Sequence, residues 1–73
     1  MKTKQQIIDR IQSDYDIGDN AEQEIYAWLS DEVLKFKTPL TFLKFLEKNL
    51  EESNTSSLQH YCISNLINFI KEI

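Results

Sequence analysis

Apolar residues recur at helical spacing along four segments of this chain, and a polar stretch precedes each segment. Residues three and four positions apart lie on the same face of an α-helix, so each stripe predicts an amphipathic helix. The four segments cover residues 4–13, 21–36, 39–52 and 57–72. We therefore predict an all-α fold, with four helices in a single domain that spans residues 1–73.

The apolar stripes differ in width. Trp28 lies at the centre of the second stripe, and we expect it to anchor the core. The fourth helix is apolar over more of its circumference than one buried face requires. We expect it to pack centrally against the other three helices; the alternative is that part of its surface stays open to a partner. Its apolar residues are Leu58, Tyr61, Cys62, Ile63, Leu66, Ile67, Phe69, Ile70 and Ile73.

Residues that suit helix starts precede the stripes. Thr3, Asn20 and Ser56 are each followed three residues later by a glutamine, a spacing that predicts a reciprocal capping box. The third helix begins with Pro39, whose missing N–H costs nothing at the first helical position. Gly18 is the only glycine, and we expect it between the first two helices with a positive φ.

The connections between the predicted helices are short. Short connections favour antiparallel neighbours, so we predict a small antiparallel four-helix bundle with up-down-up-down topology. A more orthogonal packing is the alternative, because residues 14–20 are numerous enough to turn a corner between the first two helices.

Charge is unevenly distributed along the chain. The net charge is −4 and Arg10 is the only arginine, a balance that argues against nucleic acid as a partner. Seven acidic residues and no basic one lie between Ile11 and Leu34, and lysines dominate from Lys35 to Lys48. Such a layout can orient a protein partner; the alternative is an ordinary solvated surface.

The sequence offers no constellation that supports catalysis. His60 and Cys62 are two positions apart, so a helix would direct them to different faces. A loop from Asp14 onward has oxygen ligands but lacks the glycine and glutamate that a calcium-binding EF-hand requires at positions six and twelve. We therefore expect no enzymatic activity, no catalytic residue, no metal site and no cofactor.

Cysteine content and hydropathy bear on location. The single cysteine, Cys62, excludes an internal disulfide, which suits a reducing, cytoplasmic setting. No apolar run is long enough for a signal peptide core or a transmembrane helix. We expect a cytoplasmic protein whose membrane association is peripheral at most.

Aromatic residues supply the candidate binding site. Phe36, Phe42, Phe45 and Tyr61 could line a peptide-binding groove where the third and fourth helices meet. The more frequent alternative is that all four pack inside. However, Leu43 and Leu46 compete for the same core, so we do not expect all four rings to be buried. We predict partner contacts at Lys35, Lys37, Phe42, Lys44 and Phe45, together with the accessible part of the fourth helix.

Several segments resemble the immunity proteins of class IIa (pediocin-like, enterocin A type) bacteriocins. The resemblance lies in Lys4-Gln5-Gln6-Ile7-Ile8, an acidic start to the second helix, Thr38-Pro39-Leu40 before an apolar third helix, and Ser64-Asn65-Leu66-Ile67. It implies a small cytoplasmic antiparallel four-helix bundle. It also implies a non-enzymatic protector that acts on a bacteriocin-bound sugar-transporter receptor at the inner face of the membrane.

Two features differ from that family. Its members typically carry a C-terminal tail that contributes to recognition of the cognate bacteriocin, and they are often basic. This sequence ends at Ile73 and has a net charge of −4, so the resemblance implies no particular bacteriocin. Two alternatives remain: an acidic phage or mobile-element inhibitor of a host nucleic-acid-handling enzyme, and a structural or regulatory homodimer.

Overall fold

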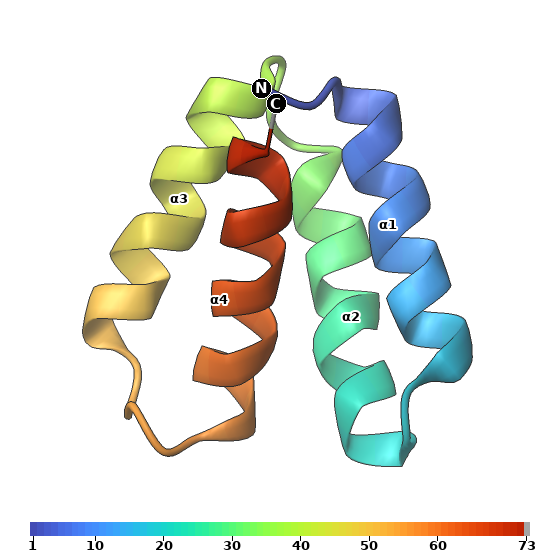
Figure 1. Cartoon of the computed structure of the whole chain (residues 1–73), viewed down its shortest axis with the longest axis vertical. Helices are drawn as coiled ribbons and strands as arrows, with labels where there is room; N and C mark the ends of the chain where they lie inside the picture. Colours follow the sequence, from blue (N-terminus) through green and yellow to red (C-terminus); the bar gives the residue numbers. More distant parts are fainter. Residues whose placement is uncertain (73) are drawn as a thin grey trace.

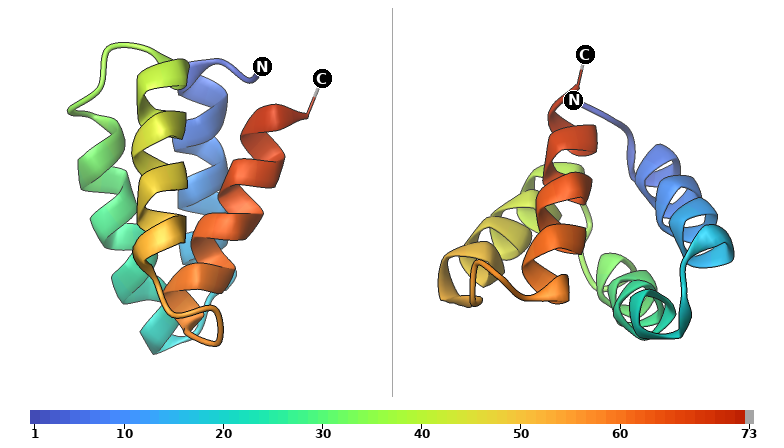
Figure 2. Two further views of the ribbon diagram at one scale, coloured as in Figure 1. Left: turned by 90° about the vertical axis from the view of Figure 1, so that its left-hand side faces the viewer. Right: turned by 60° about the horizontal axis from the view of Figure 1, so that its bottom comes forward.

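The computed structural model describes residues 1–72 and contains four α-helices of fourteen residues each: α1 (Lys4–Ile17), α2 (Asn20–Val33), α3 (Pro39–Glu52) and α4 (Leu58–Lys71). Successive helices run antiparallel, and α1–α2 and α3–α4 form two neighbouring hairpins (Figures 1 and 2). The predicted all-α, antiparallel four-helix bundle is confirmed. Ile73, which we expected on the fourth apolar stripe, lies outside the described residues.

The bundle encloses one hydrophobic core, to which α4 contributes most. Backbone contacts are closest within the α1–α2 and α3–α4 pairs and between α2 and α4. The fourth helix therefore packs against α3 and α2, and only more loosely against α1, which confirms the predicted central position in part; its Tyr61 and Leu58 remain 57% and 37% exposed. The buried core residues are Ile7, Ile11, Tyr26, Leu29, Val33, Phe42, Leu43, Leu46, Cys62, Ile63, Leu66, Ile67 and Ile70.

Trp28 is not the central anchor that the sequence suggested. It is partly buried and packs against the edge of the core, with its ring centroid 6.0 Å from that of Phe45. The inward face of α2 carries Tyr26, Leu29 and Val33 instead. Trp28 precedes Leu29 and is rotated about 100° from it around the helix, which directs the indole toward α3.

The capping pattern is confirmed at α1 and corrected at α2. The predicted box forms at α1, where the Gln6 N–H donates to the Thr3 hydroxyl at 3.2 Å and the Thr3 N–H to the Gln6 side chain at 2.9 Å. At α2 the cap is Asp19, not Asn20, and its carboxylate accepts from the Glu22 N–H at 2.9 Å. A carboxylate also complements the positive end of the helix dipole.

The predicted cap at Ser56 is also wrong by one residue. Ser57 caps α4 by accepting from the His60 N–H at 3.1 Å. Ser56 belongs to the preceding turn, where both its N–H and its hydroxyl donate to the Asn54 side chain, at 3.0 and 2.8 Å. The expected start at Pro39 is correct, with Thr38 as the cap.

Gly18 does not adopt the positive φ that we expected; its φ is −79°. Its role is steric. A Cβ at this position would lie 3.0 Å from both the carbonyl oxygen of Asp14 and the Cβ of Glu22. The last turn of α1 and the first turn of α2 therefore approach so closely that a side chain there would force them to shift by a few tenths of an ångström.

Two helices end at residues other than those predicted. The first helix continues to Ile17, four residues beyond the predicted end at Ser13. The second ends at Val33, three residues before Phe36. Phe36 instead lies in the α2–α3 connection, where its ring packs onto rings from α3, as described below.

Candidate interaction surfaces

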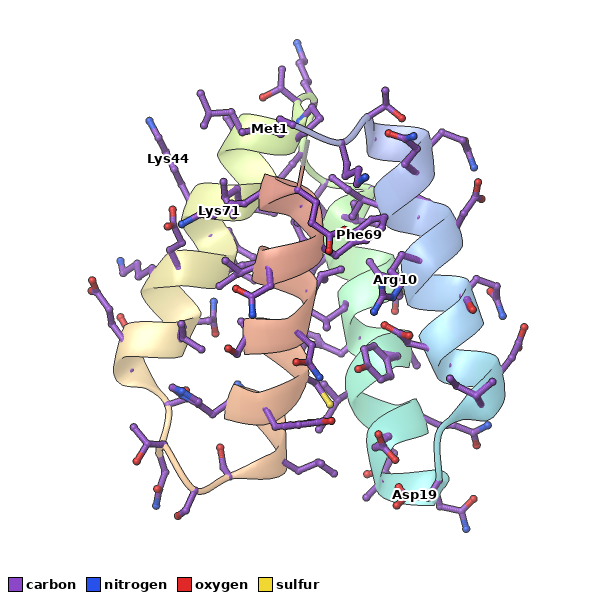
Figure 3. The ribbon with its side chains drawn as sticks, viewed as in Figure 1. Met1, Arg10, Asp19, Lys44, Phe69 and Lys71 are labelled. Carbon is purple, nitrogen blue, oxygen red and sulfur yellow. The ribbon has the colours of Figure 1, made fainter. Side chains whose placement is uncertain are left out.

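The five predicted contact residues divide into exposed lysines and inward-facing rings. Lys35, Lys37 and Lys44 are exposed, and Figure 3 shows Lys44 pointing outward from α3. Phe42 is only 1% exposed, so its assignment as a contact residue is wrong. Phe45 is partly buried against the core and offers a partner only the outer part of its ring.

An aromatic cluster explains why Phe42 is buried. Its ring lies 5.7 Å from that of Phe36 and 6.1 Å from that of Phe45, and Phe36 and Phe45 are themselves 5.1 Å apart. Trp28 extends the cluster along α2. These rings fill the space between α2 and α3, whereas Tyr61 lies elsewhere, beside α1. The structure therefore does not form the predicted peptide groove at the junction of α3 and α4.

The exposed apolar residues near the lysines are ones that the sequence analysis missed. Leu34 is 66% exposed and Leu40 is 48% exposed, on either side of the connection that carries Lys35 and Lys37. Met1, 60% exposed, lies at the same end of the bundle (Figure 3). The exposure of Leu34 could have been predicted from the sequence, because Leu34 falls outside the i, i+3, i+4 stripe that includes Val33.

The antiparallel topology separates charge between the two ends of the molecule. The α1–α2 and α3–α4 connections share one end, and the α2–α3 connection lies at the other (Figure 1). We call residues 11–26 and 46–64 the acidic end; among them are eight acidic residues and one lysine. They are Asp14, Asp16, Asp19, Glu22, Glu24, Glu47, Glu51 and Glu52, with Lys48.

The opposite half has the reverse balance. We call residues 1–10, 27–45 and 65–72 the basic end; among them are seven basic and four acidic residues. The basic residues come from every helix or its flanking segment: Lys2, Lys4, Arg10, Lys35, Lys37, Lys44 and Lys71. The acidic ones are Asp9, Asp31, Glu32 and Glu72.

Some of these cations have local partners. Lys35 pairs with Glu32 and Lys71 with Glu47, both at 3.1 Å. Both pairs involve exposed lysines, so each contributes little and can rearrange when a partner approaches. Among residues 1–72, Lys4, Lys37 and Lys44 form no ion pair.

Phe69 links α4 to the N-terminal part of the chain. The guanidinium carbon of Arg10 lies 4.8 Å from the centre of the Phe69 ring, and the Lys2 ammonium lies 5.1 Å from it (Figure 3). The Lys2 N–H also donates to the Ile70 carbonyl at 3.1 Å. These contacts hold the N-terminal segment against the end of α4 and so keep Met1 at the basic end.

A polar cleft of about 260 Å³ opens between α1, α2 and α4, mostly within the acidic end. The Arg10 Nε donates to both Asp14 carboxylate oxygens at 3.2 Å, which closes one side of it. The cleft is lined by Arg10, Asp14, Ile17, Gly18, Glu22, Tyr26, Tyr61 and Asn65. The one cation of this lining, Arg10, is therefore already paired with a carboxylate.

The buried titratable groups beside this cleft are held in their protonated, weakly nucleophilic forms. Burial raises the pKa of the Cys62 thiol and also that of the Tyr26 hydroxyl, which lies next to the thiol. A thiol with a raised pKa stays protonated and is a poor nucleophile. His60 is engaged elsewhere, with its Nδ1 2.8 Å from the Ser53 hydroxyl. Cys62 therefore serves as a core residue, as its spacing predicted.

Within residues 1–72, no group of three or more His, Cys, Asp or Glu side chains is arranged to hold a metal ion. Over the same residues, no helix combines the length and hydropathy needed to cross a bilayer. Comparison with protein-family models, with curated proteins and with solved structures found no match.

Proposed function

We propose that this chain is a small non-enzymatic binding protein that protects its producer cell, in the manner of a class IIa bacteriocin immunity protein. It would act by occupying a surface of a protein target at the inner face of the membrane. The observation that carries the proposal is the basic end, where exposed lysines adjoin the exposed apolar side chains of Leu34 and Leu40. Exposed apolar residues within a polar rim are typical of interaction surfaces.

The contact residues in this proposal differ from those drawn from the sequence. Lys35, Lys37 and Lys44 remain, because their side chains are exposed at the basic end. Leu34 and Leu40 take the place of the two phenylalanines of α3 as apolar contacts. Large apolar side chains that leave water on binding contribute more to affinity than rim charges do.

A protection assay tests the proposal directly. The chain is expressed in a bacteriocin-sensitive Gram-positive strain, which is then challenged with several pediocin-like bacteriocins. We expect survival against at least one of them. Leu34→Ser together with Leu40→Ser should abolish survival, whereas Leu58→Ser, an exposed apolar residue of the acidic end, should not. Growth inhibition that is the same with and without the chain, for every bacteriocin, would reject the immunity function.

Affinity capture identifies the target. Solubilised membranes of the same strain are passed over the immobilised chain, with and without bacteriocin, and washed at low and then high salt. Recovery of a sugar-transporter complex only when bacteriocin is present, retained at high salt, supports the proposal. Such retention is expected because apolar contacts are not screened by salt, unlike exposed ion pairs.

The acidic end supports the second candidate, a mimic of a nucleic-acid backbone. Asp14, Asp16, Asp19, Glu22 and Glu24 surround the α1–α2 connection, and Glu51 and Glu52 lie at the same end of the bundle. A phosphate mimic would capture a nucleic-acid-handling enzyme in the same experiment and release it steeply as salt rises. Recovery of the bait alone, with a mass that doubles with concentration, would instead favour a homodimer.

A further inference from the structure

The lysines of the basic end come from all four helices or their flanking segments rather than from one side of the bundle. Lys4 begins α1, Lys35 and Lys37 follow α2, Lys44 lies on α3 and Lys71 ends α4. Met1, Leu34 and Leu40 expose apolar side chains at this same end. We propose that the basic end docks on the surface of an anionic phospholipid bilayer, with the lysines on headgroups and the leucines at the headgroup–acyl boundary.

The distribution of charge also fits a flat, extended negative surface. A protein that contacts one flank would meet the lysines of one or two helices. A bilayer that lies across the end would meet lysines from all four, each of which gains from the negative surface potential. Apolar side chains surrounded by Lys are the combination that holds proteins in a membrane interface.

The acidic end does not oppose this docking. The bundle measures 27 × 26 × 23 Å, so the acidic side chains around the α1–α2 and α3–α4 connections stay well beyond one Debye length when the basic end touches the bilayer. The four acidic residues of the basic end are outnumbered there by seven basic ones. That length is about 10 Å at 0.1 M ionic strength, and repulsion of the acidic end is therefore screened. The opposed charges instead orient the molecule, because a negative surface attracts one end and repels the other.

This inference deepens the proposed function. It rests on that function only for the location, the inner face of the membrane, at which the chain would meet a bilayer. Docking would bring the chain to the inner membrane face through the same residues that the proposed function assigns to the protein target, so lipid and target would compete for the basic end. The binding of the chain alone to protein-free vesicles tests it without any assumption about the target.

The experiment is co-sedimentation with vesicles of phosphatidylcholine alone and of phosphatidylcholine mixed equally with phosphatidylglycerol. We expect binding to the anionic vesicles that is at least tenfold stronger than to the neutral ones and that falls steeply between 50 mM and 500 mM salt. Lys37→Gln together with Lys44→Gln should lower the partition coefficient about thirtyfold. Leu34→Ser should weaken binding at both salt concentrations.

Matched control variants separate docking through the basic end from a general effect of positive charge on vesicle binding. Lys48→Gln removes the one lysine of the acidic end and should leave vesicle binding within twofold of the original. Circular dichroism of each variant checks that the fold is retained, which we expect because all these side chains are exposed. Equal effects of Lys48→Gln and Lys37→Gln would overturn the assignment to the basic end.

Two further outcomes are decisive. Absence of binding to anionic vesicles, with capture of a membrane protein that depends on Lys37 and Lys44, would overturn the inference and assign the lysines to protein contact. Anionic-vesicle binding that follows the expected pattern, in a chain that protects no cell, would uphold the inference and reject the proposed function. The two proposals can therefore fail separately.

Discussion

Replacement of Phe42 distinguishes a structural residue from a contact residue. Phe→Ala at a fully buried site costs about 3–5 kcal/mol, which is comparable to the whole stability of a domain this small, about 3–5 kcal/mol. Phe42→Ala should therefore leave the chain largely unfolded. Phe42→Leu keeps most of the volume but loses ring contacts with Phe36 and Phe45, so we expect a loss of about 1–2 kcal/mol.

Urea unfolding, followed by the fluorescence of Trp28, measures these losses. Trp28 is the only tryptophan and packs beside Phe45, so its emission reports on this cluster. Lys44→Ala is the matched control on the same helix; its side chain is exposed, and its stability should change by less than about 0.5 kcal/mol. The reasoning fails if Phe42→Ala remains as stable as Lys44→Ala. It also fails if Phe42→Leu folds with unchanged stability yet loses affinity for vesicles or target.

Three further predictions concern caps and buried acids. Asp19→Ala should destabilise the fold by about 1 kcal/mol and Asn20→Ala by much less, because the Asp19 carboxylate, and not the Asn20 side chain, accepts from the Glu22 N–H; the opposite order in urea unfolding would refute the capping assignment. The pKa values of Tyr26 and Cys62 are raised in the native protein, so both groups keep their protons there at alkaline pH. In the unfolded chain the Cys62 thiol loses its proton above about pH 9 and the Tyr26 hydroxyl above about pH 10. Stability should therefore fall as pH rises through this range, by about 1.4 kcal/mol per pH unit for each group, and Tyr26→Phe should remove one group's share of that slope. A thiol reagent should label Cys62, which has no exposed surface, only at the rate at which the bundle opens; rapid labelling of the native protein would contradict its burial.

The sequence predicted those features that depend on neighbours along the chain. The four apolar stripes gave the number of helices, and Thr38-Pro39 gave the start of α3 to the residue. Thr3 and Gln6 cap α1 as their spacing indicated. These features follow from contacts within one helical turn, so a local pattern contains the information that decides them.

Local patterns were insufficient where several residues compete for one role. Asp19 and Asn20 both suit a helix cap, and Ser56 and Ser57 do also. The choice at α2 accompanies a contact between helices, in which the Gln23 side chain donates to the Tyr15 carbonyl at 3.1 Å. Gln23, which we had assigned to a capping box, is therefore used to join α2 to the end of α1.

Burial of the aromatic rings and separation of charge were decided only by the tertiary structure. Phe42 and Phe45 lie three residues apart on one side of α3 and their rings touch, but the cover over them comes from another segment, because the ring of Phe36 packs on both. Along the chain, Lys4 is far from Lys37 and Lys71, and Asp19 is far from Glu51. Antiparallel packing of four equal helices places the first group at one end and the second at the other. The sequence by itself determined four amphipathic helices and their polar surface; the order in which those helices reverse determined that the surface has a basic end and an acidic one.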